Sequence, residues 1–233
     1  MVCAERQNGP NERRGKVLVV DDHPIVREGL ADLINKEEDL VVCGWAQDIP
    51  ETIKAIKSLN PDVVTVDISL GDANGLELIK DIKTQFPDVP VLALSMHQES
   101  SYAERAIRAG AKGYITKQEA TKNVILAIRR VLDGGLYLSE EMKDKLLYSV
   151  VGYHDSRGGV SPIDRLTDRE LEVFSLLGEG KATREIAERL CLSIKTVETY
   201  RARIKEKLHL SSGPKLLQQA FAWAHGRDKS DSL

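Results

Sequence analysis

The sequence has no long hydrophobic run, and the cysteines that it contains are few and scattered. No apolar stretch approaches the ~18 residues needed to cross a bilayer, which argues against a membrane-spanning protein. The 3 cysteines, Cys3, Cys43 and Cys191, have no CxxC or Cys/His spacing, so neither a disulfide framework nor a zinc site is expected. Residues 1–15 lack the apolar segment of a secretory signal. We therefore expect a disordered N-terminal tail, a cytoplasmic location and no membrane partner.

Length and charge give the first indication of organisation. With 233 residues, 42% hydrophobic and 30% charged, the chain has a globular composition and a length that favours two domains. The net charge is −3, yet residues 193–215 contain six Lys and Arg against two Glu. A basic segment in an acidic protein is typical of contact with nucleic acid. Because many charged helices simply face solvent, the excess is not sufficient by itself.

The N-terminal part alternates short apolar runs with amphipathic stretches. This alternation predicts an α/β domain with a doubly wound, parallel, five-stranded sheet. Pro24 favours the first turn of a helix, and Gly110 favours the position just after one. The strands are expected at 17–21, 40–46, 62–67, 90–95 and 112–116, and the helices at 24–36, 49–59, 75–85, 100–109 and 121–133.

The pattern changes after Gly134-Gly135. A charged helical segment at 139–148 precedes a stretch rich in Gly, Ser and Pro at 152–162, which is typical of a linker. No strand pattern follows it. Thr167-Asp168-Arg169-Glu170 forms a capping box, and Thr183 and Ser193 are further N-cap candidates, so we expect a small all-α domain of four helices. The predicted parts are a tail at 1–15, the α/β domain at 16–135, a linker with a helical segment at 136–163, the helical domain at 164–228 and a tail at 229–233.

Two of the predicted strands end in carboxylates. The strand Val63–Val66 ends at Asp67, and the strand Val17–Val20 is followed by Asp21-Asp22. In open α/β sheets, ligands bind at the carboxyl ends of strands, so these side chains converge if the two strands are neighbours. Crowded carboxylates repel one another unless a cation lies among them, and an all-oxygen site suits Mg²⁺ (or Mn²⁺). We interpret Asp67 as a phosphoryl acceptor.

These positions, taken with others, resemble a known family. Ser95 follows the fourth strand, Lys117 follows the fifth, and Tyr114 stands three residues before the lysine. With the three carboxylates, this set resembles the receiver domain of two-component response regulators, which has a flavodoxin-like fold. Residues 166–208, with Glu185-Ile186-Ala187 and Lys207-Leu208, resemble a LuxR-type helix-turn-helix, with the motif at about 182–201. Together the two parts cover nearly the whole chain, as in the NarL/FixJ subfamily.

The resemblance implies roles for the residues of the first domain. Asp67 would accept a phosphoryl group from a sensor histidine kinase or a phosphotransfer protein. Asp22, Asp67 and the backbone carbonyl of Ser69 would hold the metal ion, with Asp21 acting through water. The Lys117 ammonium would pair with one phosphoryl oxygen.

The Ser95 hydroxyl would bond another phosphoryl oxygen and, with Tyr114, would transmit the signal. The implied partners are double-stranded DNA, a second copy of the chain when phosphorylated and, as a candidate, RNA polymerase. The implied catalysis is limited to the protein's own phosphoryl acceptance and loss.

Two positions depart from the family pattern, and two histidines lie near the acidic residues. Gly71 and Gln118 stand where proline is common in the family. We expect a trans Lys117-Gln118 bond because a cis non-proline peptide costs ~2.5–4 kcal/mol. His23 and His97 lie near the acidic residues, but no spacing typical of transition-metal ligands surrounds them, so we expect both to line the site.

A helical wheel divides the segment 193–208 into two faces. The core stripe is predicted to contain Ile194, Val197, Ile204 and Leu208. On the opposite face and its flanks, Glu198, Thr199 and Ala202 are expected to approach base edges. Arg201 lies beside the core stripe, and we favour a structural ion pair for it, for example with Glu170. Contacts with DNA phosphates are expected from Thr183, Lys195, Tyr200, Arg203 and Lys215.

The sequence therefore predicts a phosphorylation-controlled, DNA-binding transcription regulator. One alternative is an aspartate-dependent phosphatase on a similar sheet. Such enzymes need a second acid two residues after the nucleophile, where this chain has Ser69. Another alternative is a regulator that acts by protein contact without DNA, against which the basic segment argues.

Overall fold

The computed structural model describes residues 14–70, 74–96, 99–140, 142–143, 162–190 and 192–225. The chain divides into two compact units, and the main boundary between them falls between Ser139 and Glu140. Most of the helix expected at 139–148 lies outside the described residues, as do the N-terminal tail up to residue 13 and the linker stretch 152–161. Those expectations stay predictions.

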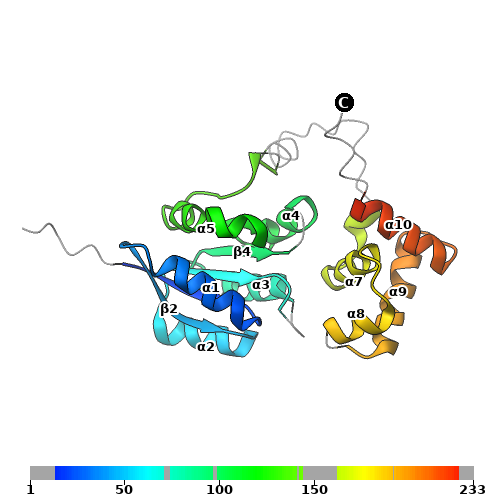
Figure 1. The fold of residues 1–233 in the computed structure, drawn as a ribbon, viewed down its shortest axis with the longest axis horizontal. Coiled ribbons are helices and arrows are strands. Elements are labelled where there is room, and N and C mark those ends of the chain that lie inside the picture. Colours follow the sequence, from blue (N-terminus) through cyan, green and yellow to red (C-terminus); the bar gives the residue numbers. More distant parts are fainter. Residues whose placement is uncertain are drawn as a thin grey trace, which may run out of the picture. The chain divides into compact units, whose positions relative to one another are not determined.

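The N-terminal unit is built on one parallel sheet, as predicted (Figure 1). The strand order is β2-β1-β3-β4-β5, which makes β3 the central strand. All five residues of β3 are buried because helices cover both faces of the sheet. The strands are β1 (Gly15–Val20), β2 (Leu40–Ala46), β3 (Val63–Asp67), β4 (Val91–Ser95) and β5 (Gly113–Thr116).

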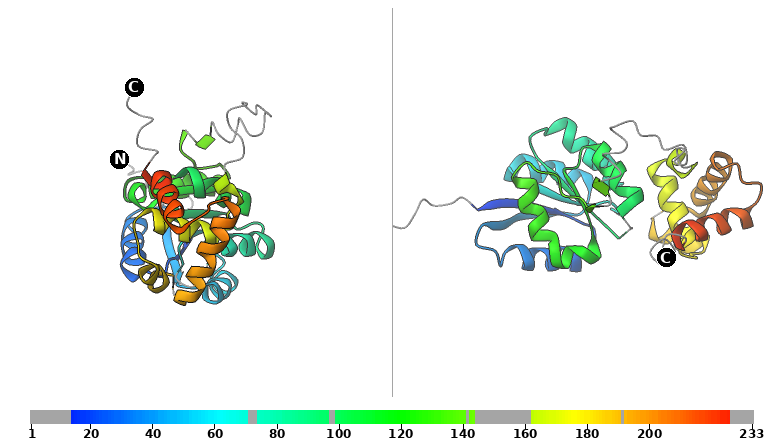
Figure 2. Two further views of the ribbon diagram at one scale, coloured as in Figure 1. Left: turned by 90° about the vertical axis from the view of Figure 1, so that its right-hand side faces the viewer. Right: turned by 90° about the horizontal axis from the view of Figure 1, so that it is seen from above.

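Five helices cover this sheet in two layers. The helices α1 (Pro24–Ile34) and α5 (Lys117–Leu132) lie on one face, where alternate strand residues such as Val17, Val19 and Leu92 form a core with them. The other face is covered by α2 (Ile49–Leu59), α3 (Gly75–Gln85) and α4 (Glu99–Ala109) (Figure 2). The doubly wound α/β prediction is confirmed.

Helix starts follow local capping chemistry. Pro24 opens α1, and Gly110 follows α4 with a φ of 114°, as predicted. The predicted start of the last helix at 121 is wrong, because α5 begins at Lys117. Thr116 and Glu119 form a capping box there, and the N–H of Glu119 donates to Thr116 Oγ1. Lys117 is therefore fixed between a strand and a helix rather than in a loop.

The chain returns to the sheet after α5. Residues 136–138, which we call the strap, lie along β5, with a parallel bridge between Gly113 and Tyr137. The N–H of Tyr114 donates to the Tyr137 carbonyl at 2.9 Å, and the N–H of Tyr137 donates to the Lys112 carbonyl at 3.1 Å. The strap satisfies backbone groups of an edge strand that would otherwise be open. Its three residues are too few to show a strand period in the sequence.

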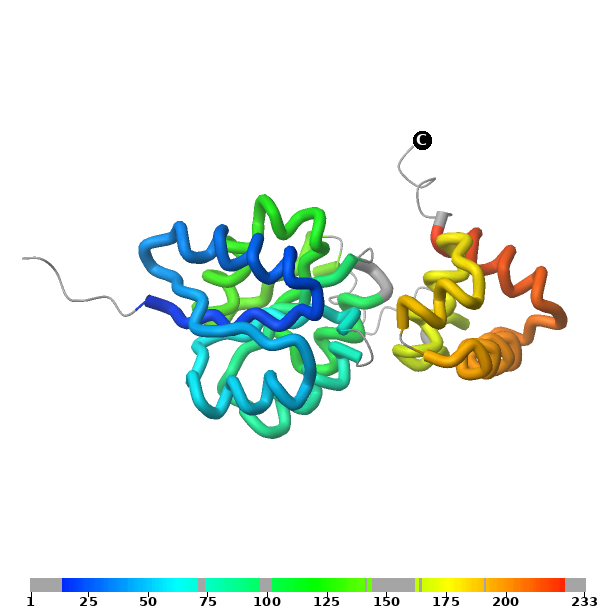
Figure 3. The backbone as a smooth tube through the Cα atoms, turned by 60° about the horizontal axis from the view of Figure 1, so that its bottom comes forward, coloured from blue at the N-terminus to red at the C-terminus, as the bar shows by residue number. Residues whose placement is uncertain are grey.

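The C-terminal unit contains only helices among its described residues, as predicted (Figure 3). Phe174 and Trp223 bring α7 and α10 together, with ring centroids 5.5 Å apart. A Cβ at Gly178 would lie 2.5 Å from the Ala220 carbonyl, so glycine permits the close approach of these helices. No helix in the described parts of the chain is long and apolar enough to span a membrane. The elements are a 3₁₀ turn η1 (Pro162–Arg165), α7 (Asp168–Gly178), α8 (Thr183–Arg189), α9 (Ile194–Lys207) and α10 (Gly213–His225).

Two of the three predicted N-caps in this unit are confirmed. Thr167 caps α7 in a capping box with Glu170, and Ser193 Oγ accepts from the Thr196 N–H at 3.0 Å at the start of α9. The prediction for Thr183 is wrong. The N-cap of α8 is Ala182, which has an extended backbone, and Thr183 is already helical.

The strap provides a test of packing at β5. A Cβ at Gly113 would lie 2.8 Å from Leu92 Cδ1 and 3.1 Å from the Tyr137 carbonyl oxygen. We predict that Gly113→Ala lowers the free energy of unfolding by about 1–3 kcal/mol, because the strap or Leu92 must shift. Gly29→Ala is the matched control, since Gly29 lies inside α1 with nothing within 4 Å of its Cβ position. That control should raise stability by about 0.5–1 kcal/mol. Urea unfolding of the full chain measures both, and equal effects would contradict the assigned contact.

Candidate functional site

The sheet topology brings the predicted carboxylates together. Because β1 and β3 are parallel neighbours with Val20 beside Val66, the residues that end them lie at the same edge of the sheet. Asp21 and Asp67 are each 1% exposed, and Asp22 is half-buried. Ligand oxygens of these three residues and a ring nitrogen of His23 all lie within 4.8 Å of one another. The predicted convergence of the three carboxylates is confirmed.

Lys117 connects two of these carboxylates. Its Nζ donates to Asp21 Oδ2 at 2.6 Å and to Asp67 Oδ2 at 2.7 Å, and its side chain is 11% exposed. Burial lowers the pKa of Lys117, but the charges of Asp67 and Asp21 outweigh burial, so this pKa lies above its usual value. The first residue of α5 therefore places a cation directly against the residue predicted to accept the phosphoryl group.

The donor set at this edge fits a hard divalent cation. Asp22 Oδ1 is shielded from solvent and accepts no hydrogen bond from any described residue, although His23 Nδ1 lies 2.9 Å away. Three carboxylates this close repel one another, and a cation among their oxygens would offset that repulsion. The sequence predicted only a lining role for His23, yet its backbone N–H donates to Asp21 Oδ1 at 2.9 Å. His23 thus helps to orient one carboxylate of the cluster.

The remaining predicted residues of this unit lie on neighbouring strands. Ser95 ends β4, the strand that pairs with β3, and both Ser95 and Tyr114 are fully buried. No cis peptide occurs in the described parts of the chain, so the trans Lys117-Gln118 bond is confirmed. Gly71 and His97 lie outside the described residues.

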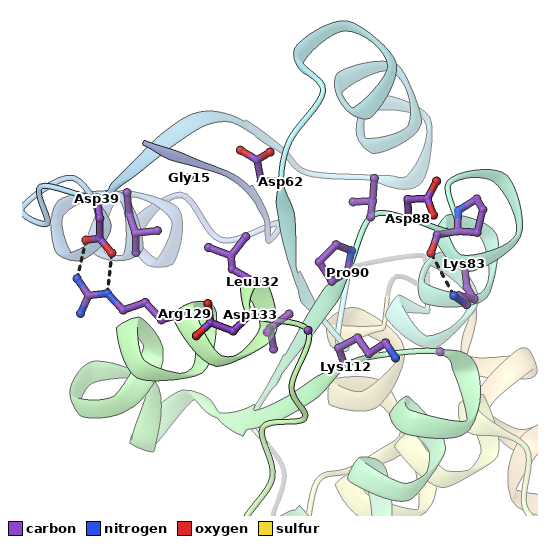
Figure 4. Close-up of a pocket in the computed structure, with 16 residues that line it drawn as sticks. Gly15, Asp39, Asp62, Lys83, Asp88, Pro90, Lys112, Arg129, Leu132 and Asp133 are labelled. Carbon is purple, nitrogen blue, oxygen red and sulfur yellow. Dashed lines mark hydrogen bonds and ion pairs between the residues drawn. The ribbon is translucent and has the colours of Figure 1, made fainter. Parts of the chain in front are cut away.

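A separate depression lies at the opposite edge of the same sheet (Figure 4). It has a volume of about 810 Å³ and is lined at the amino ends of strands by Gly15, Leu40 and Pro90. Arg129 pairs there with Asp39 at 2.6 Å. Acidic and basic side chains are mixed around it, so it has no charge of one sign. This depression therefore lies at the opposite end of the strands from the carboxylate cluster.

The predicted faces of α9 are confirmed except at its start. Val197 and Ile204 are fully buried and Leu208 is 8% exposed, as expected for a core stripe. Ile194, the first residue of α9, is 53% exposed, so its assignment to the core is wrong, although Val197 in the same turn is fully buried. The predicted DNA-facing side chains are accessible: Lys195, Glu198, Thr199, Ala202, Arg203 and Lys215 are exposed, and Thr183 and Tyr200 are partly exposed.

The ion pair suggested for Arg201 has different partners. Arg201 Nη1 donates to Glu198 Oε1 at 2.9 Å and also to Thr183 Oγ1. Glu170 is paired instead with Lys207, whose Nζ lies 2.6 Å from Glu170 Oε2. Arg201 lies near the start of α8, whereas Lys207 lies at the end of α9 that packs against α7. Sequence spacing on one helix could not show which neighbouring helix each cation faces.

Comparison with known proteins matches both units. The model of the response regulator receiver domain matches residues 17–129, and the model of the bacterial regulatory proteins of the luxR family matches residues 164–220. The oxygen regulatory protein NreC of Staphylococcus carnosus is 35% identical over 209 residues, which cover 88% of this chain and 96% of that protein. The chain belongs to the response regulators with a LuxR-type DNA-binding domain.

Solved structures of related regulators agree with this assignment. RcsB of Salmonella typhimurium has a TM-score of 0.63 and 26% identity, with 90% of this chain and 98% of that chain covered. RcsB bound to promoter P1flhDC with the phosphomimetic BeF₃⁻ has a TM-score of 0.59 and 26% identity, and covers 89% and 98% of the two chains. The response regulator thus combines a receiver domain with a helix-turn-helix domain, as its sequence predicted.

One ion pair stabilises the DNA-binding domain of this regulator. Burial raises the pKa of Glu170, but hydrogen bonds from Lys207 and from the N–H and hydroxyl of Thr167 outweigh burial, so the pKa lies below its usual value. A carboxylate with a lowered pKa in the folded state contributes stability above its unfolded pKa, and this stability is lost as pH falls through the folded pKa.

Removing the lysine tests this contribution. We predict that Lys207→Met lowers the free energy of unfolding at pH 7 by about 1–3 kcal/mol, because a buried carboxylate loses a charged hydrogen-bond donor. The difference in the free energy of unfolding between Lys207→Met and wild type should become smaller below pH ~4.5, where Glu170 becomes protonated in the unfolded chain. Tryptophan fluorescence in a Trp45→Phe background isolates Trp223, which packs on Phe174 in this domain. A difference that stays constant down to pH 2 would contradict the pairing.

Proposed function

We propose that Asp67 accepts a phosphoryl group from a sensor histidine kinase or a phosphotransfer protein, and that this group controls binding of promoter DNA through α9. The observation that supports it most directly is the Lys117 ammonium held between Asp21 and Asp67 at 2.6 and 2.7 Å. The family models match residues 17–129 and 164–220, which supports domain limits of 16–135 and 164–228.

The proposed transfer needs little covalent chemistry from the protein. Asp67 attacks the phosphorus of a phosphohistidine, a carboxylate O–P bond forms, the N–P bond breaks, and the donor imidazole leaves with the electron pair. Lys117 neutralises charge on the phosphoryl oxygens, since its Nζ already lies beside Asp67. The Ser95 hydroxyl, one strand away, provides a further donor.

A Mg²⁺ ion, or Mn²⁺ in its place, would be held by Asp22, Asp67 and the backbone carbonyl of Ser69, with Asp21 acting through water. When bound, such an ion neutralises charge on the transferring phosphoryl group. The carboxylate oxygens of Asp21, Asp22 and Asp67, which lie within 4.8 Å of one another, support this ligand set.

The acceptor assignment has a direct test. Asp67→Asn should abolish Mg²⁺-dependent phosphate incorporation from acetyl phosphate or a phosphohistidine donor, because an amide oxygen is a poor nucleophile. Asp62→Asn is the matched control, since Asp62 lies at the other end of β3 and should leave incorporation unchanged. Radiolabelled phosphate and intact mass measure both variants. Full labelling of Asp67→Asn would contradict the assignment.

Signal transmission is proposed to pass through Ser95 and Tyr114. A phosphoryl group adds up to about two negative charges and strong acceptor oxygens, which attract the Ser95 hydroxyl and leave room for the Tyr114 ring to move. Tyr114 lies in β5, between α4 and α5. The surface formed by 100–109, 112–116 and 121–133 is then biased toward pairing with a second copy.

Sedimentation measures this pairing. The phosphorylated chain should double its mass at micromolar concentration, because two receiver surfaces become complementary. Ser95→Ala should keep phosphate on Asp67 yet shift the dimerisation constant toward the unphosphorylated value, since the hydroxyl that detects the group is missing. Identical masses with and without phosphorylation would argue against the mechanism.

DNA recognition is proposed to use the exposed face of α9. Glu198, Thr199 and Ala202 would approach base edges, because the buried Val197 and Ile204 fix the opposite face on the core. Phosphate contacts would come from Lys195, Tyr200, Arg203 and Lys215. A dimer would place two such helices in half-sites about one helical turn apart.

Two substitutions separate base contacts from phosphate contacts. Lys195→Ala should weaken binding to all duplexes about equally, because one phosphate contact is lost. The slope of log K against log salt concentration should become shallower by about one. Thr199→Ala should cost ~1–3 kcal/mol only at particular base pairs. Fluorescence anisotropy over a salt series, with every base pair of a selected site varied, measures both effects. If Lys195→Ala changed the base preference and Thr199→Ala did not, the orientation assigned to α9 on the DNA would be wrong.

A further inference from the structure

Glu198 is held by two neighbouring side chains on the exposed face of the DNA-binding domain. Its Oε1 accepts from Arg201 Nη1 at 2.9 Å and from Thr183 Oγ1 at 3.1 Å. Arg201 Nη1 also donates to Thr183 Oγ1, so the three side chains form a closed network. Arg201 lies one turn from Glu198 on α9, whereas Thr183 is the first residue of α8. The network therefore joins both helices of the helix-turn-helix.

The number of donors and acceptors in this network decides which oxygen of Glu198 is occupied. The single hydroxyl proton of Thr183 is donated to Glu198, so Thr183 has none left for a DNA phosphate in this arrangement. Glu198 Oε1 already has two donors, while its Oε2 has no partner among the described residues. The Glu198 side chain is 55% exposed and that of Arg201 only 20%. One carboxylate oxygen is therefore anchored, and the other is left as an acceptor.

We propose that Arg201 and Thr183 are positioning residues that aim Glu198 Oε2 at the exocyclic amino group of a cytosine or adenine in the major groove. The inference rests on the proposed DNA recognition by α9. In the major groove cytosine and adenine present amino donors, whereas guanine and thymine present carbonyl acceptors that repel a carboxylate. Arg201 and Thr183 then determine which base pairs are accepted.

Two physical effects make the network favourable for recognition. A flexible glutamate loses rotamer freedom on binding, and a carboxylate anchored beforehand has already lost most of it. A free carboxylate is also repelled by DNA phosphates, and the adjacent Arg201 guanidinium offsets that charge locally. An arginine that faces Glu198 therefore acts on base preference, whereas an arginine that faces solvent acts on overall affinity.

Helix α9 also contains an arginine that faces solvent, and this residue is a matched control for Arg201. Arg203 lies two residues after Arg201 on α9, is exposed, and has no ion pair within the described part of the chain. Arg201→Met and Arg203→Met remove the same charge from the same helix. Only the first removes a partner of Glu198.

The test uses the full chain and a duplex selected from a random pool, with every base pair then varied singly. Glu198→Ala should lower discrimination at one base pair by roughly tenfold. Arg201→Met and Thr183→Val should reduce discrimination at that same base pair, and Arg201→Met combined with Glu198→Ala should add little. Arg203→Met should weaken binding to all duplexes alike and leave their ranking unchanged.

Each outcome has a defined meaning. A uniform loss of affinity in Arg201→Met and Thr183→Val, with base preference intact, would overturn the positioning roles. A Glu198→Ala variant that keeps its base preference would also overturn them. Thermal unfolding checks that each variant is folded, and Thr183→Val decides the matter if Arg201→Met does not fold. Absence of any duplex binding by the wild-type chain would instead contradict the proposed function of α9.

Discussion

The receiver domain depends on one electrostatic constraint, which is that Asp21 and Asp67 are buried side by side and must be neutralised. Two carboxylates with 1% exposure each would be strongly unfavourable as ions in an apolar environment without a partner. The Lys117 ammonium supplies that partner through two short hydrogen bonds. Asp21 follows β1, Asp67 ends β3, and Lys117 follows β5 as the first residue of α5. These three strands and the start of α5 must therefore keep their relative positions for the site to form.

The sheet order explains why these groups meet. β1 and β3 are neighbours, and the carboxyl ends of all five strands point to one edge because the sheet is parallel. The depression at the opposite edge is larger than a single ion requires, but its mixed charges include an ion pair between Arg129 and Asp39. In this protein the depression and the carboxylate cluster lie at opposite ends of the strands.

The DNA-binding domain uses carboxylate–cation pairs in two ways that depend on burial. Glu170 and Lys207 link α7 to the end of α9, and the side chain of Glu170 is only 3% exposed, so this pair stabilises the fold. Glu198 and Arg201 lie on the free face of the same helix, where a pair contributes little to stability. What the second pair provides is a fixed side-chain position on the face that is proposed to approach DNA.

The sequence by itself indicated the parallel sheet, the helical C-terminal domain and the position of Asp21, Asp22 and Asp67 at strand ends. Lys117 was assigned to the same site through the resemblance to receiver domains, and the strand order decided that these groups meet. Short apolar runs, helical periods of 3.6 residues and polar residues at strand ends are local signals, and parallel topology converts them into a site. The tertiary structure alone decided the strap on β5, the exposure of Ile194 and the partners of Arg201 and Lys207. Each of these depends on which element lies opposite a given side chain. Spacing along one helix or strand specifies a face but not the neighbour that covers it.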